Sequence, residues 1–250
     1  MSLNAVARSA GRIAQRGLLV WAALILTAVG GAGTALAGTA LAGIAGSEAL
    51  APASYTLAGT EHGSLAAEAH RELSAARQTR YQHITDVDEQ TGRFDYDCSG
   101  FVGYALRRID PAAYRALPVS KTRPLAQDIV TAIRAGGFWQ RVPAVTELGP
   151  GDLVAWLTPD DSDSDNTGHV MIVLAVPTRS QRAGEWLVQV ADSTTSPHAA
   201  DRRVAGGPTG LGQGTIGLTT DTSERPVAYY WRGGVSTKLE HTEIALGRLR

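Results

Sequence analysis

The chain contains a single cysteine, Cys98, whose neighbours suggest that it does chemistry. Cysteine attacks carbonyl groups as a thiolate, so a catalytic cysteine needs surroundings that favour loss of its proton. Asp97 or Ser99 can cap a helix that begins at Cys98. An apolar stripe with helical spacing then follows, formed by Phe101, Val102, Ala105 and Leu106. The positive end of this predicted helix would stabilise a thiolate and later an oxyanion.

A thiolate of this kind needs a base, and His169 is the best placed of the six histidines. It follows Gly168 and opens the apolar run 170–174, which predicts a strand. The entrance of a strand is a rigid position from which an imidazole can meet a helix start. The remaining histidines lie in the linker, the first helix, an irregular polar segment or close to the C-terminus, apart from His198.

A third residue should orient the imidazole of His169, and the chain offers two candidates. Asp192 ends the next apolar run, 186–191. If strands 169–176 and 186–192 pair as a hairpin through the polar loop 177–185, Asp192 lies beside His169. His198, six residues further on, is the alternative.

The elements that must hold these residues change character along the chain. Helical periodicity covers 61–77, the segment beginning at Cys98, and 123–137. Strand patterns follow at 152–157, 169–176 and 186–192, with shorter candidates at 216–218 and 227–231. Residues 81–94 are interpreted as irregular, and 210–214 as flexible or tightly turned backbone. Helices followed by strands predict an α+β fold in which an antiparallel sheet packs against helices.

The N-terminal segment has the order of a secretory signal. Arginines at positions 8, 12 and 16 precede an apolar run over 17–29, and small residues follow. We interpret 1–37 as a signal peptide, or as a membrane anchor if it is not cleaved, with a mature N-terminus near Gly38 or Gly43. Residues 38–60 are predicted to be a linker and 61–250 the catalytic domain. The protein is therefore expected to be secreted or in the cell envelope, touching a membrane only through an uncleaved N-terminal segment.

Composition limits the remaining classes of function. With 23 basic and 24 acidic residues the formal charge is −1, which gives no reason to expect a nucleic-acid partner. One cysteine cannot form an intramolecular disulfide or a cysteine-based zinc site. We expect that the protein uses no metal and no cofactor, and that it is a monomer.

Three motifs resemble those of the NlpC/P60 peptidases, papain-like cell-wall hydrolases within the broader NlpC/P60–CHAP group. The motifs are Asp97-Cys98-Ser99-Gly100-Phe101, Pro150-Gly151-Asp152-Leu153 and Gly168-His169-Val170. The resemblance implies a papain-like fold with Cys98 as nucleophile at a helix N-terminus and His169 as base. Asp192 holds the place of the family's third residue. It also implies that Tyr96, Asp97 and Ser99 line the substrate site.

The expected activity is hydrolysis of an amide bond through an acyl-enzyme. Export and the resemblance together suggest a peptide substrate, namely the stem peptides of peptidoglycan. Two alternatives remain open on the same residues. One is a transglutaminase-like or acyltransferase enzyme, and the other is a non-catalytic binding module of the cell envelope.

Overall fold

The computed structural model describes residues 64–158, 166–203 and 206–250. The predicted signal peptide and linker lie outside these ranges. Within them, no helix is long and apolar enough to cross a membrane.

Three predicted helices are confirmed, and their ends follow from local sequence. Ser64 caps α1 (Leu65–Ala75) and Asp97 caps α2 (Cys98–Ile109), each through a side-chain oxygen that accepts a backbone N–H. α4 (Ala126–Ala135) ends at Gly136, whose φ of +84° suits glycine. A short helix, α3 (Pro111–Arg115), was not predicted and begins with proline at its first turn.

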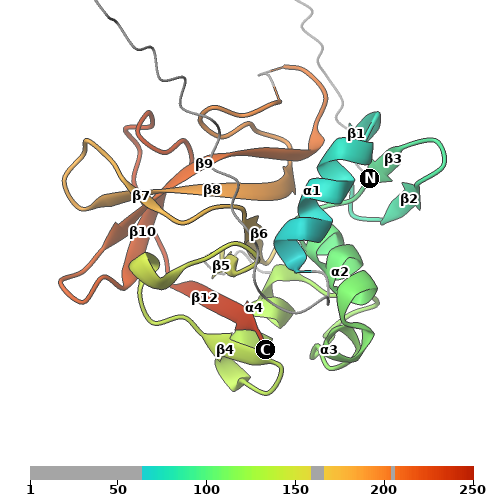
Figure 1. Cartoon of the computed structure of the whole chain (residues 1–250), viewed down its shortest axis with the longest axis horizontal. Coiled ribbons are helices and arrows are strands. Elements are labelled where there is room, and N and C mark those ends of the chain that lie inside the picture. Colours follow the sequence, from blue (N-terminus) through green and yellow to red (C-terminus); the bar gives the residue numbers. More distant parts are fainter. Residues whose placement is uncertain (1–63, 159–165, 204–205) are drawn as a thin grey trace, which may run out of the picture. The chain divides into compact units, whose positions relative to one another are not determined.

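The predicted antiparallel sheet is also present, as a nine-stranded sheet among the described residues (Figure 1). The path runs β11-β10-β9-β8-β6-β5-β12-β4, with β7 paired to β8. The strands are β4 (Trp139–Arg141), β5 (Leu153–Leu157), β6 (Gly168–Val173), β7 (Thr178–Arg179), β8 (Glu185–Thr194), β9 (Gly210–Thr220), β10 (Pro226–Tyr230), β11 (Glu240–His241) and β12 (Ile244–Leu249). The expected pairing of the strands that carry His169 and Asp192 is confirmed, since Ile172 pairs with Ala191 and Val173 with Val190.

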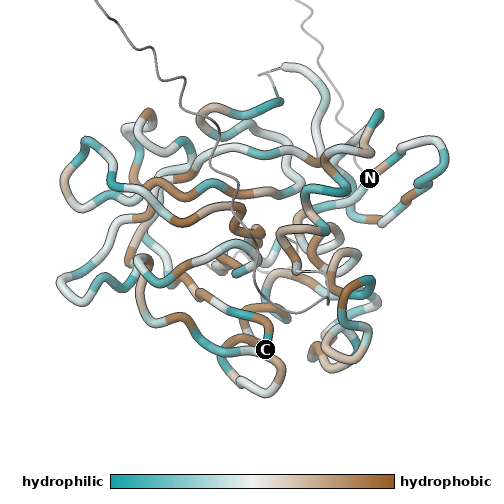
Figure 2. Tube along the Cα trace, viewed as in Figure 1, coloured by the Kyte–Doolittle hydropathy of each residue, from teal (hydrophilic) through white to brown (hydrophobic). Residues whose placement is uncertain are grey.

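The two faces of this sheet bury different residues, as period-2 alternation requires. One face packs against α1, α2 and α4 and includes Ala155, Val170 and Ile172. The other face forms a second apolar cluster that includes Trp156 and Met171. The sheet curves enough for β10 to approach β12 across this second cluster. Figure 2 shows hydrophobic residues around β6 and along β8.

The glycine-rich segment 210–214 is not turned backbone, so that prediction was wrong. It is the first half of β9, which pairs with β8 over ten residues from Thr194↔Gly210 to Glu185↔Thr219. A Cβ at Gly212 would lie 2.3 Å from Nε of Arg203, and one at Gly214 would lie 2.7 Å from Cβ of His198. The glycines therefore leave room for buried side chains that cross the strand.

Residues 81–94, interpreted from sequence as irregular, belong in part to a second sheet. Its order is β1-β3-β2, with β1 (Gln78–Arg80), β2 (Asp86–Asp88) and β3 (Arg93–Asp95). These strands are only three residues long, too short to show a period in the sequence. The last strand, β12, was also missed, although it lies between β5 and β4 in the large sheet.

Glu72 of α1 gives a prediction about stability. Its carboxyl is fully buried, Oε2 accepts a hydrogen bond from the Tyr96 hydroxyl at 2.6 Å, and burial raises its pKa from 4.5 to about 8. Between pH 4.5 and about pH 8, the folded state therefore retains a proton on Glu72 that the unfolded state has released. The resulting stability is fully present below pH 4.5 and is lost as the pH rises through 8, an effect on the order of 5 kcal/mol.

Glu72→Gln should keep the Tyr96 hydrogen bond without a group that ionises. Urea unfolding at pH 5 and pH 9 will test this. We expect similar free energies of unfolding at pH 5 and a clear advantage for the glutamine variant at pH 9. A difference between the two proteins that does not change with pH would contradict the assignment.

Candidate active site

Cys98 is the first residue of α2 and is buried. The helix begins there because Oδ1 of Asp97 accepts the N–H of Gly100 at 2.7 Å. The first N–H groups of a helix have no carbonyl partner within it and carry its partial positive charge. The geometry thus places the thiol where the sequence predicted, at the positive end of a helix.

His169 lies in β6 between Cys98 and Asp192. Its Nε2 is 2.6 Å from Oδ2 of Asp192, and Cys98 lies close enough to influence the pKa of the ring. The rings of Trp156 and Trp231 flank the imidazole, with centroids 5.5 and 5.2 Å away. The imidazole is therefore fixed on both sides and keeps one nitrogen for the cysteine.

The electrostatics of this site favour a charged imidazole. Burial by itself lowers the pKa of His169, but a Cys98 thiolate and the hydrogen bond to Asp192 outweigh it and raise the pKa to about 10. At neutral pH the imidazole of His169 is therefore positively charged. An imidazolium beside a cysteine stabilises the thiolate, which is the nucleophilic form of that residue.

Asp192 is fully buried in β8 and contacts both His169, its predicted neighbour, and His198. Besides His169, its Oδ2 meets Nε2 of His198 at 2.9 Å, and its Oδ1 accepts from Nη2 of Arg203 at 2.8 Å. Burial raises the pKa of Asp192, but these cationic partners and hydrogen bonds hold it well below its usual value. Of the two candidates for the third residue, Asp192 contacts His169, and His198 contacts Asp192.

Arg203 and Trp231 complete the surroundings of Asp192, and the sequence reasoning missed both. The Arg203 guanidinium bonds both oxygens of Asp201, at 2.9 and 2.7 Å. The carbonyl of Trp231 lies 2.9 Å from Nδ1 of His198. No local signal could identify Arg203, because the space for its side chain is left by Gly212 of β9.

His169, Asp192 and His198 also satisfy a distance condition for a metal site, with ligand atoms within 4.8 Å of one another. Two observations argue against that use. The shared oxygen of Asp192 already takes two short hydrogen bonds, and Arg203 places a full positive charge on the other oxygen. Repulsion from that charge would oppose a bound cation, so the arrangement suits hydrogen bonding better than metal binding.

Tyr96, which the sequence predicted to line the substrate site, is instead buried. Its ring is fully buried and packs between Phe94 and Phe101, at centroid distances of 6.5 and 5.6 Å. Its hydroxyl is used by Glu72. The Tyr96 side chain is buried in the core and lines neither of the two cavities described next.

Asp97 and Ser99, the other two predicted substrate residues, lie beside a cavity of about 420 Å³, and Ser99 is part of its lining. Both are tied to Arg123, whose Nη2 is 2.7 Å from Oδ2 of Asp97 and whose Nη1 donates to Oγ of Ser99. A second cavity of about 420 Å³ is lined by His169 and four aromatic residues. His83 lines both cavities. The aromatic residues are Tyr81, Trp156, Tyr229 and Trp231.

Comparison of the chain with models of known families, with curated proteins and with solved structures finds no match. The resemblance to the NlpC/P60 peptidases therefore rests on the three sequence motifs.

Proposed function

We propose that this chain is an exported cysteine hydrolase with papain-like architecture of the NlpC/P60 type, which cleaves an amide bond in peptidoglycan stem peptides. One observation carries the proposal. The imidazole of His169 contacts the buried carboxylate of Asp192 at 2.6 Å and interacts electrostatically with Cys98, which lies at a helix start. A nucleophile, a base and an orienting group in contact are the arrangement required for acyl transfer.

In the proposed mechanism, His169 holds Cys98 as a thiolate, which attacks the carbonyl carbon of the scissile amide. The backbone N–H of Cys98 stabilises the oxyanion. The imidazolium of His169 protonates the leaving amine, and the acyl group stays on sulfur. The neutral imidazole then takes a proton from water while the water oxygen attacks the acyl carbon. The C–S bond breaks, the free acid leaves, and the Cys98 thiolate and the His169 imidazolium are restored. Asp192 keeps the imidazole oriented and stabilises its positive charge in both halves of the cycle.

The substrate class is supported by the three motifs and by the N-terminal signal pattern, together with the two cavities. One cavity is lined by Ser99, directly after Cys98, and the other by His169. A peptide with residues on both sides of the scissile bond could use both.

The test is incubation of the purified full chain with muropeptides of known structure, followed by mass spectrometry. Hydrolysis predicts a fragment pair whose summed mass exceeds that of the substrate by one water. Addition of an amine nucleophile tests the alternative, because an acyltransferase would yield an amine adduct in place of the free acid. Absence of any product across the muropeptide set would leave a binding module and overturn the proposal.

A further inference from the structure

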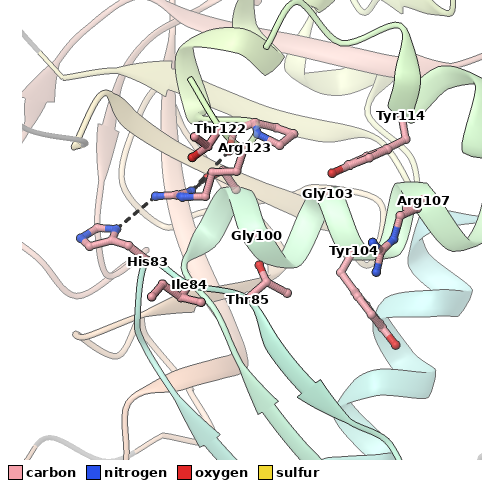
Figure 3. A pocket seen from close by; sticks show the side chains of 12 residues that line it. His83, Ile84, Thr85, Gly100, Gly103, Tyr104, Arg107, Tyr114, Thr122 and Arg123 are labelled. Carbon is pink, nitrogen blue, oxygen red and sulfur yellow. Dashed lines mark hydrogen bonds between the residues drawn. The ribbon is translucent and has the colours of Figure 1, made fainter. Parts of the chain in front are cut away.

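The cavity beside α2 is lined by cationic, polar and apolar side chains and by no acidic one. We call it the α2 cavity. Arg107, Arg123 and His83 supply its basic groups, and the hydroxyls of Tyr104 and Tyr114 belong to residues of the same lining (Figure 3). The remaining lining residues are Ile84, Thr85, Ser99, Gly100, Gly103, Thr122 and Pro124. A volume of about 420 Å³ is within the range of small-ligand sites.

The buried carboxylate of Asp97 contacts three side chains of this lining and is already paired. The side chain of Asp97 is only 5% exposed, and its Oδ2 pairs with Arg123 at 2.7 Å. Nδ1 of His83 lies 3.1 Å from the same oxygen, and Oδ1 serves as the helix cap. Asp97 therefore has no oxygen left for a positively charged group of a ligand. The α2 cavity disfavours cations even though an aspartate lies behind its wall.

Arg107 differs from Arg123, because its charge is not compensated. It is exposed on α2, and its guanidinium carbon is 5.6 Å from the centre of the Tyr104 ring. Across residues 64–158, 166–203 and 206–250 it forms no ion pair. Glu89, which accepts from the Tyr104 hydroxyl, is shared by Arg71 and Arg108 instead. The guanidinium of Arg107 is thus available for an anion.

We propose that the α2 cavity binds a carboxylate of the substrate, with Arg107 as the residue that pairs with it. This proposal rests on the proposed function, which supplies a peptide as the substrate. A guanidinium can hold a carboxylate through two parallel hydrogen bonds. Arg107 is nine residues from Cys98 on the same helix, roughly 13 Å along its axis. The substrate carboxylate that pairs with Arg107 should therefore lie about four residues of extended peptide from the scissile carbonyl. If a long substrate side chain carries the carboxylate, that residue can be closer to the scissile bond.

The experiment compares matched peptides in which a single glutamate, at each position up to four residues from the scissile bond, is exchanged for glutamine. We expect the full-length wild type to prefer one glutamate peptide by on the order of tenfold in kcat/KM. The preference should appear in KM rather than kcat, because the carboxylate is remote from the reacting atoms. Arg107→Gln should remove the preference, so that the variant cleaves the glutamate and glutamine peptides with equal kcat/KM.

Arg115→Gln is the matched control, since Arg115 is exposed on α3 outside the cavity and its loss changes the net charge equally. It should keep the preference. Equal loss in both variants, or no preference at any position in the wild type, would overturn the proposal while leaving the hydrolase assignment intact.

A second readout separates this proposal from the proposed function. Fluorescence anisotropy of labelled glutamate and glutamine peptides with full-length Cys98→Ala measures binding without cleavage. If the wild type cleaves nothing, tighter binding of a glutamate peptide that disappears in Cys98→Ala/Arg107→Gln would still support the carboxylate site. Equal binding of all pairs would reject it.

Discussion

Replacing Cys98 with alanine is expected to lower the rate of amide hydrolysis by about 10⁴-fold or more, because no other group can form the acyl-enzyme. The chain has no second cysteine to take over the reaction. The change removes one buried sulfur atom from a helix start and leaves the Asp97 cap in place, so the fold should persist. Turnover of muropeptides, followed by chromatography and mass spectrometry, measures the effect.

Cys98→Ser is the informative companion to this variant. A hydroxyl occupies nearly the same space but does not ionise at neutral pH, so its activity should also be very low. Thermal unfolding should show that both variants are folded. Full turnover by the alanine variant on any substrate that the wild type cleaves would end the assignment of Cys98 as nucleophile.

Asp192→Asn is expected to lower turnover by roughly 10²–10⁴-fold, because an amide can hold His169 but cannot stabilise its positive charge. The hydrogen bond and the charge of Asp192 both raise the pKa of His169. Their loss should therefore lower that pKa from its value of about 10. The imidazolium of His169 exists below the pKa of that residue and is lost as the pH rises through it. The alkaline limit of the wild-type rate should thus lie near pH 10 and move to lower pH in the variant.

Alkylation of Cys98 by a small reagent such as iodoacetamide reports the same ion pair without a substrate. Near neutral pH, Asp192→Asn should react more slowly than the wild type, since its thiolate has a weaker cationic partner. Circular dichroism should establish that the variant is folded, because Asp192 also pairs with Arg203.

His198→Gln is the matched comparison, because it keeps a donor for Asp192 and leaves the Asp192–His169 contact untouched. We expect a much smaller loss of turnover than in Asp192→Asn. If the glutamine variant is crippled while Asp192→Asn stays near wild type, His198 must be the third residue. If neither variant matters, Cys98 and His169 act as a dyad.

Local patterns in the sequence were sufficient for the elements that carry the central residues. The helix at Cys98 begins at a capping aspartate, and the strand of His169 follows from a continuous apolar run after a glycine. The hairpin that brings Asp192 to His169 follows from two apolar runs joined by a short polar segment. Each of these features depends on residues close in sequence, so cap chemistry and apolar runs predict it.

The tertiary structure alone decided which side chains surround this centre. Tyr96 is adjacent to the Asp97 cap yet points into the core, while Arg123 and His83 reach Asp97 from distant segments. These contacts depend on how whole elements pack, and no local period encodes that.

The same holds for the support of Asp192. Arg203 can reach it only because glycines of β9 lack the Cβ atoms that would occupy its place. In the sequence that stretch has the composition of a turn, because a glycine-rich stretch resembles a loop until its neighbours are known. The pairing of β9 with β8 and the insertion of β12 between β5 and β4 join residues far apart in the chain. Strand order and register set these contacts, and both are properties of the folded chain as a whole.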